Sequence, residues 1–176
     1  VTLFAPAFGD AALMHYAALL HHACGLTLGA TTGPVPAAPA PAEPDTDTVR
    51  LMVCGAHMQG LPLNHQLTER GARLVASTQT APSYRLYALA GGPPYRPGLV
   101  RDEAVGTAIE VEVWELPLAE LGGFMAGVPA PLGIGTVELE DGEWCKGFIC
   151  EPCAIDTARE ITEYGGWRGF LAGLDS

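Results

Sequence analysis

Positive charge is scarce in this chain. Nine Lys and Arg residues stand against twenty Asp and Glu residues among 176, which gives a net charge of −11 at neutral pH. Such a field repels the phosphate backbone of nucleic acids and the anionic surface of membranes. We therefore expect neither nucleic acid nor a membrane as a partner. A site for an anion has to be positive locally, against the field of the whole chain.

Long apolar runs are also lacking. The sequence contains no stretch of about 18 apolar residues, the length that a membrane-spanning helix needs, and its first residues do not have the basic and apolar segments of a secretory signal. The five cysteines are an odd number, and two of them lie in apolar runs typical of strands, which favours reduced thiols. These features together predict a cytoplasmic protein.

Composition divides the chain into three regions. Residues 1–32 predict a strand over residues 1–6 and then a helix that starts near Asp10 and ends near Gly25, because apolar side chains recur on one stripe between them. Residues 33–48 hold five prolines among alanines and predict an extended linker. Residues 49–176 contain the remaining periodic segments and are expected to form the main domain.

Strands dominate this third region. The apolar pattern predicts strands over residues 49–54, 73–78, 84–89, 107–116, 134–139 and 144–150, with the last two joined as a hairpin. Short helices are expected at residues 64–70, at 117–125 and after residue 166, and turns at residues 91–94 and 97–98. This mixture predicts an α+β fold with a mixed, barrel-like β-sheet and short helices.

The first predicted strand of the main domain ends in a loop that Gly55 and Gly60 bound. Backbone N–H groups of such a loop, here from Gly55 through Ala56 to Met58, can form a nest that binds an anion. His57 lies on this loop, and functional side chains often lie on loops. A lone histidine is weak evidence, however, and on spacing alone a turn histidine without a catalytic role is the more frequent case.

Residues 54–64 (CGAHMQGLPLN) resemble the signature of the C-terminal domain of allophanate hydrolases. Further segments resemble that family in the same order: residues 84–89 (YRLYAL), 97–99 (PGL), 109–114 (IEVEVW), 129–139 (PAPLGIGTVEL), 146–151 (KGFICE) and 161–168 (ITEYGGWR). Residues 1–30 resemble the last strand and helix of the family's amidase domain. The stretch with the amidase nucleophile and its lysine is absent, so we do not expect this chain to hydrolyse allophanate itself.

The resemblance implies a fold similar to that of γ-glutamylcyclotransferases. Cyclotransferase chemistry is not expected, because Cys54 stands where those enzymes have a tyrosine and residues 121–128 contain no carboxylate. The implied function belongs to urea degradation. The amidase domain, an expected partner, releases ammonia from allophanate, and the C-terminal domain decarboxylates the N-carboxycarbamate that remains. His57 matches the expected general acid, which would protonate the nitrogen as CO2 leaves.

N-carboxycarbamate is a small dianion, so its site needs N–H or cationic donors. The loop amides at Gly55, Ala56 and Met58 are candidates, and so is Lys146. On a regular strand Lys146 shares a face with Trp144 and Phe148. Its side chain could therefore line a cavity or extend past the aromatic rings into solvent.

Three weaker substrate-binding candidates complete the set. Asn64 ends the signature segment, Tyr84 lies on the third predicted strand, and Glu110 lies on the strand expected over residues 107–116. Glu110 and Glu112 share one face of that strand, and such alternation is most often typical of a solvated face. We retain Glu110 as a candidate for acid–base chemistry.

The residues offer two alternatives to a metal-free enzyme. Cys150 and Cys153 form a lone CxxC, but no second pair or neighbouring histidine completes a four-ligand zinc site, so neither metal nor cofactor is expected. The domain could instead serve assembly, as in a homodimer, because carbamates lose CO2 readily without help. A small pocket that gathers His57, loop amides and a cation favours the enzyme, and a flat apolar patch favours assembly.

Overall fold

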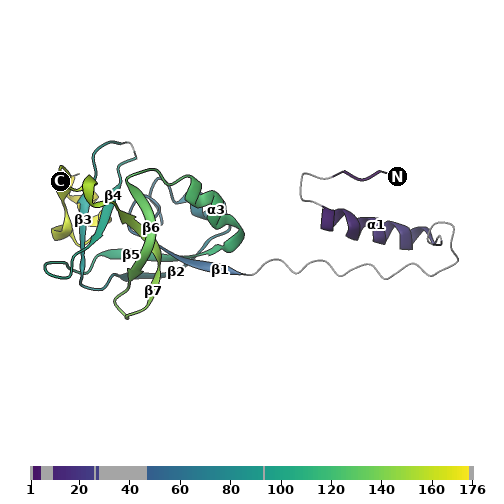
Figure 1. The fold of residues 1–176 in the computed structure, drawn as a ribbon, viewed down its shortest axis with the longest axis horizontal. Helices are drawn as coiled ribbons and strands as arrows, with labels where there is room; N and C mark the ends of the chain where they lie inside the picture. The colour runs from purple at the N-terminus through teal and green to yellow at the C-terminus, as the bar shows by residue number, and fades with distance from the viewer. Residues whose placement is uncertain (1, 5–9, 26, 28–46, 93, 175–176) are drawn as a thin grey trace. The chain divides into compact units, whose positions relative to one another are not determined.

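The computed structural model describes residues 2–4, 10–25, 27, 47–92 and 94–174, and the chain forms two compact units, Val1–Thr46 and Asp47–Ser176 (Figure 1). In the first unit helix α1 (Asp10–Cys24) is followed by Gly25 with φ of 63°, so the predicted helix and its stop are confirmed. Residues 2–4 have no regular structure, so the predicted strand is wrong there, and its residues 1, 5 and 6 lie outside the described part. The linker expected over residues 33–48 also lies outside it, except for Asp47 and for Thr48, which begins the first strand.

The second unit alternates strands with short helices. Its elements are β1 (Thr48–Val53), α2 (His65–Thr68), β2 (Arg73–Gln79), β3 (Tyr84–Ala88), β4 (Pro97–Arg101), β5 (Glu110–Pro117), α3 (Leu118–Ala126), β6 (Leu132–Glu138), β7 (Trp144–Cys150), β8 (Arg159–Glu160) and α4 (Trp167–Leu174), with 3-10 turns at Pro152–Ala154 and Thr162–Tyr164. None of the helices within the described ranges has the length and apolar character to cross a bilayer.

The strands form two sheets. The larger has the order β2-β5-β1-β7-β6, in which β1 runs antiparallel to β5 and parallel to β7, and β6 and β7 form the predicted hairpin. The smaller has the order β4-β3-β8 and is antiparallel. In Figure 1 the smaller sheet and the C-terminal segment lie at one end of this unit, and α3 lies at the other. The predicted α+β class with a mixed sheet is confirmed, and the strands are arranged in two sheets that do not close into one barrel.

Most predicted elements match to within one or two residues at each end, and three differences are larger. Residues 97–98 begin β4 instead of forming a turn, and proline is tolerated there because it is the first residue of an edge strand, where no ladder bond needs its N–H. Strand β5 begins at Glu110 and not at Thr107, because the Ile109 N–H donates to the Thr80 hydroxyl at 3.0 Å instead of joining a ladder. Strand β8 has two residues, too few to show periodicity.

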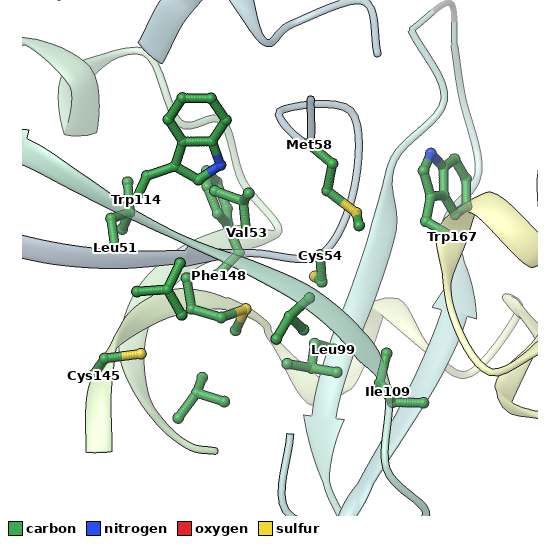
Figure 2. Close-up of a cluster of buried hydrophobic side chains, with 14 of the residues drawn as sticks. Leu51, Val53, Cys54, Met58, Leu99, Ile109, Trp114, Cys145, Phe148 and Trp167 are labelled. Carbon is green, nitrogen blue, oxygen red and sulfur yellow. The ribbon is translucent and has the colours of Figure 1, made fainter. Parts of the chain in front are cut away.

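The core surrounds the C-terminal half of β1. Leu51, Met52 and Val53 are consecutive and fully buried, which requires cover on both faces of the strand. Figure 2 shows Leu51, Val53 and Cys54 gathered with Phe148 from β7 and other apolar side chains. The burial continues beyond the strand to Met58, so the loop after β1 is part of the core and not a solvated connection.

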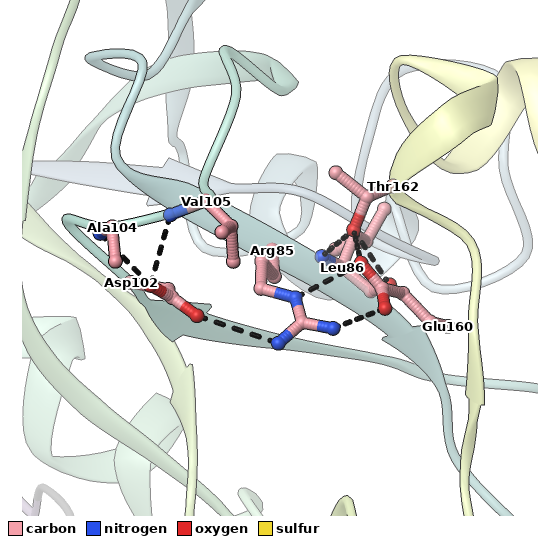
Figure 3. A network of polar contacts seen from close by, with 7 residues as sticks. All are labelled: Arg85, Leu86, Asp102, Ala104, Val105, Glu160 and Thr162. Carbon is pink, nitrogen blue, oxygen red and sulfur yellow. Dashed lines mark hydrogen bonds and ion pairs between the residues drawn. The ribbon is translucent and has the colours of Figure 1, made fainter.

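A polar network holds the smaller sheet together (Figure 3). Arg85 of β3 donates to Glu160 of β8 and, at 3.3 Å, to Asp102, which follows β4. Asp102 also accepts the backbone N–H groups of Ala104 and Val105, and these bonds, with the Arg85 charge, hold the pKa of its carboxyl below the ordinary value. The network joins three segments that are distant in sequence and fixes the end of β4.

We predict that the second unit folds without the first. The described ladder partners of β1 are β5 and β7, and the Leu118 N–H donates to the Asp47 carbonyl at 2.9 Å, so the shortest complete fragment begins at Asp47. A fragment of residues 47–176 should unfold cooperatively at nearly the same temperature as the full chain in circular dichroism melts. Aggregation, or a broad non-cooperative transition, would show that the core needs residues 1–46.

Candidate functional site

A cavity of about 280 Å³ opens where β1 ends. Its walls come from the loop after β1, from α2, from residues 94–97 at the start of β4, from the C-terminal end of α3 and the loop beyond it, and from β6 and β7. Most of this lining is apolar. The polar side chains in it are His57, Gln66 and Arg96. The cavity thus combines apolar walls with a few polar groups, as binding sites for small molecules usually do.

Gly55 lets the chain leave β1 close to β4. A Cβ atom at this position would lie 2.5 Å from the Cγ and Cδ atoms of Pro97, and both residues line the cavity. A side chain here would have to displace a proline ring that β4 holds in place. Glycine at residue 55 is therefore required by packing against Pro97.

Hydrogen bonds close the loop on itself. The Leu63 N–H donates to the Ala56 carbonyl at 2.8 Å, and the Asn64 side-chain amide donates to the His57 carbonyl at 2.9 Å. The Met58 N–H donates to the Gly55 carbonyl at 2.9 Å. Residues 55–64 thus form a tight loop whose backbone is fixed on both sides of His57, so the imidazole has a defined position.

Two phenylalanines and a glutamine surround the His57 imidazole. The ring stacks on Phe148 with centroids 5.1 Å apart and planes inclined by 19°, and it meets the edge of Phe124 at 5.3 Å. Its Nε2 lies 3.0 Å from the Gln66 Oε1. Because a carbonyl oxygen can only accept, Nε2 carries the proton and Nδ1 is left as the nitrogen that can take up or release one.

The surroundings of His57 disfavour its charged form. Burial lowers the pKa of the imidazole below its ordinary value, and the positive charges of His65, Arg70 and Arg96 lower it further, while the bond to Gln66 opposes them. His57 is therefore neutral at neutral pH in the empty cavity. A bound anion would reverse this balance, because it favours the imidazolium.

Arg96 supplies a positive charge to the cavity. It is half-buried, and within the described part of the chain its guanidinium makes no hydrogen bond or ion pair. The backbone N–H groups of Ala56 and His57 likewise donate to no described protein group. The Cys54 thiol on the same wall is inert, because burial raises its pKa to about 12. Donors suited to a small anion are thus available, and a thiolate nucleophile is not.

The structure brings together only some of the residues singled out from the sequence. Gly55, Ala56 and His57 line the cavity. Asn64 lies outside the lining, and its side-chain amide donates to the His57 carbonyl. Met58 is fully buried beneath the loop and is not part of the lining. The signature segment therefore forms one wall of the cavity, with its second half supporting the first.

The other three candidates lie elsewhere. The Tyr84 hydroxyl is buried and accepts the Glu138 N–H at 2.9 Å, and Glu110 forms an ion pair with Arg168 at 2.9 Å. Lys146 is exposed and donates to the Thr136 hydroxyl at 3.2 Å. Strand alternation did place Lys146 on the side of Phe148, but the cavity covers only the end of β7, so Lys146 lies beyond it.

The prediction that the two glutamates of β5 lie on a solvated face is wrong for Glu112, whereas the Glu110 side chain is partly exposed. Glu112 is 2 % exposed. Its carboxylate accepts the Gln59 N–H at 2.7 Å and the Trp114 indole N–H at 3.0 Å, and it pairs with Arg168 at 2.6 Å. No local pattern could indicate this, because the cation that compensates Glu112 comes from α4.

Sequence reasoning missed Gln66, Arg96 and Phe124. Gln66 and Phe124 lie on short helices whose orientation the pattern could not give. Arg96 had a usable signal, since a cation beside the Pro-rich segment that precedes β4 is conspicuous in a chain with nine Lys and Arg residues. In the described ranges no group of three or more His, Cys, Asp or Glu side chains is arranged to hold a metal ion.

Comparison with known proteins identifies the family. Residues 49–172 match the family described as the allophanate hydrolase C-terminal domain. The urea amidolyase of Saccharomyces cerevisiae is 44 % identical over 133 residues, which cover 73 % of this chain and 7 % of that protein. The structure of Kluyveromyces lactis allophanate hydrolase is similar with a TM-score of 0.70 and 42 % identity, over 73 % of this chain and 22 % of that one.

A third similar structure is that of a protein specific to uropathogenic E. coli, with a TM-score of 0.67 and 36 % identity, over 72 % of this chain and 97 % of that one. The chain thus spans a small part of the yeast relatives and nearly the whole of the bacterial one. The resemblance of residues 54–64 and the segments that follow is confirmed. This chain belongs to the allophanate hydrolase C-terminal domain family.

Proposed function

We propose that this domain decarboxylates N-carboxycarbamate, with His57 as the general acid. The observation that carries the proposal is the cavity, whose lining includes His57, Arg96 with a guanidinium unpaired in the described chain, and Ala56, whose backbone N–H, like that of His57, has no partner there. A concave site with these donors suits a small dianion better than it suits a flat protein contact. In this proposal the amidase domain of the same enzyme supplies the substrate.

The reaction follows from the positions of the donors. The dianion enters, pairs through one carboxylate with Arg96, and its charge draws a proton onto the Nδ1 of His57. The bond between nitrogen and the other carboxyl carbon then breaks, CO2 leaves, and the electron pair stays on nitrogen, which takes the Nδ1 proton. The products are CO2 and carbamate, and His57 returns to its neutral form. The apolar walls exclude water, which strengthens both charge interactions.

We predict that His57→Ala slows CO2 release by about 10²- to 10⁴-fold, because a proton donor contributes that much to such a step. An amidase that releases ammonia from allophanate is added to generate the substrate in place, and CO2 and ammonia are measured together. Ammonia release in the first step should not change. His57→Gln keeps a polar side chain but cannot transfer a proton, so it should be almost as slow.

The control for this experiment is His22→Gln, which replaces an exposed histidine of α1 that lies outside the cavity lining. It should retain the parent rate of CO2 release. If His57→Ala releases CO2 as fast as the parent domain, His57 is not the acid, and the assembly function becomes the better explanation.

We predict that Arg96→Gln lowers kcat/KM for CO2 release by roughly 10- to 100-fold, mainly through KM, because a charged hydrogen bond contributes about 1.5–3 kcal/mol. Arg73→Gln is the matched control, since Arg73 is exposed and pairs only with Glu115 in the described chain. An unchanged KM in Arg96→Gln would remove Arg96 from the substrate site.

We predict that the imidazole of His57 titrates below the ordinary histidine pKa in the empty domain, because it is buried. Malonate, a small unreactive dicarboxylate, should raise this pKa and drive proton uptake on binding. NMR titration of the assigned ring resonances, with and without malonate, measures both pKa shifts. A downward shift with malonate would contradict the proposal.

The lowered pKa also makes the stability of the domain depend on pH. In the unfolded chain His57 takes up its proton at the ordinary histidine pKa, whereas in the folded chain it does so only at a lower pH. The free energy of unfolding therefore decreases as the pH falls from the ordinary pKa to the lowered one.

A further inference from the structure

We infer that Arg168 of α4 is a positioning residue for His57, which it serves by clamping Gln59 and so fixing the loop that carries the imidazole. The expected effect on CO2 release rests on the proposed function. The expected effect on the loop rests on the hydrogen bonds alone. Arg168 touches neither the cavity nor the imidazole.

Arg168 and Glu112 together bind both backbone polar groups of Gln59, its carbonyl and its N–H. Arg168 donates through Nη2 to the Gln59 carbonyl at 2.9 Å, and through the same nitrogen to Glu112 at 2.6 Å. Glu112 in turn accepts the Gln59 N–H at 2.7 Å. The backbone of Gln59 is thereby held by a cation on one side and by an anion on the other, through side chains from α4 and β5.

Burial makes this clamp stiff. Glu112 is 2 % exposed and also accepts the Trp114 indole N–H at 3.0 Å, so its carboxylate has little freedom to turn. Glu110 accepts from the Nη1 of Arg168 at 2.9 Å. Partial burial opposes the charge of Arg168, but the bonds to Glu112 and Glu110 outweigh it and raise the pKa of the guanidinium, so it stays charged.

The clamp completes the support of the loop. The hydrogen bonds among residues 55–64 close the loop on itself, but they do not tie it to the sheet. The contacts of Gln59 with Glu112 and Arg168 do so, two residues beyond His57. Without them Gln59 loses its hydrogen bonds to β5 and α4, the loop segment that follows His57 is less firmly held, and a displacement of about 1 Å in a catalytic group can cost roughly 100-fold in rate.

Only arginine has the fork geometry for these contacts. The guanidinium reaches Glu110, Glu112 and the Gln59 carbonyl at once because its nitrogens lie in one plane. A lysine at this position keeps the charge beside Glu112 but places a single nitrogen among three acceptors. Arg168→Lys therefore keeps the positive charge that compensates Glu112 but removes the set of hydrogen bonds that positions the loop.

The experiment compares Arg168→Lys and Arg168→Met with Arg159→Met in the full chain. Arg159 is the matched control, since its guanidinium lies over the Phe170 ring of α4 at 5.7 Å but has no contact with Gln59. Three quantities are measured: amide hydrogen exchange of Gln59, the His57 ring pKa by NMR, and kcat and KM for CO2 release.

Arg168→Lys should stay folded, speed amide exchange at Gln59 by at least about tenfold, move the His57 pKa toward its ordinary value, and lower kcat about 10- to 100-fold with little change in KM. Arg159→Met should change none of these. The inference is overturned if Arg168→Lys lowers the melting temperature but leaves Gln59 exchange and the His57 pKa unchanged. The NMR readouts need no reaction, so if they move while the parent domain itself releases no CO2, the proposed function has failed and the clamp stands.

Discussion

The strand β1 is paired on both edges and covered on both faces over its last three residues, and the site depends on this constraint. A strand held in this way delivers the following residue to a fixed point and in a fixed direction. At that point Gly55 passes within contact distance of Pro97, and the chain turns into the loop that carries His57. The sheet therefore fixes the point from which the loop that carries the imidazole begins.

The cavity differs in charge from the chain as a whole. The whole chain carries a net charge of −11, yet the cavity contains an unpaired guanidinium in the described structure and a neutral imidazole, with no carboxylate in its lining. Acidic side chains elsewhere are engaged by arginines: Glu160 by Arg85, and Glu112 by Arg168. An anion that reaches the cavity thus meets a cation, no carboxylate and mostly apolar walls, beside which a charge contact is stronger than in water.

The sequence predicted the elements of the second unit well and the site in part. Alternation and turn residues located most strands, because half-buried strands follow a period of two. Two of the wrong predictions that bear on the site concern Pro97, which was expected in a turn, and Glu112, which was expected on a solvated face. Both residues depend on neighbours distant in sequence: Pro97 on its place at a sheet edge, and Glu112 on a cation from α4. Periodicity carries no information on such contacts, and the resemblance of residues 54–64 indicated His57 but not the helix residues that surround it.

The separation between Gln59 and Arg168 has a consequence for biosynthesis. Arg168 follows Gln59 by 109 residues, so at a translation rate of about 5–20 residues per second the loop waits roughly 5–20 s for the guanidinium. During that interval the Glu112 carboxylate has no cation to accompany it into the interior, and burying it alone is unfavourable. The contacts between β5 and the loop can therefore be completed only after α4 has been synthesised. The cavity wall that carries His57 thus depends for its last hydrogen bonds on a helix made long after it, at the far end of the domain.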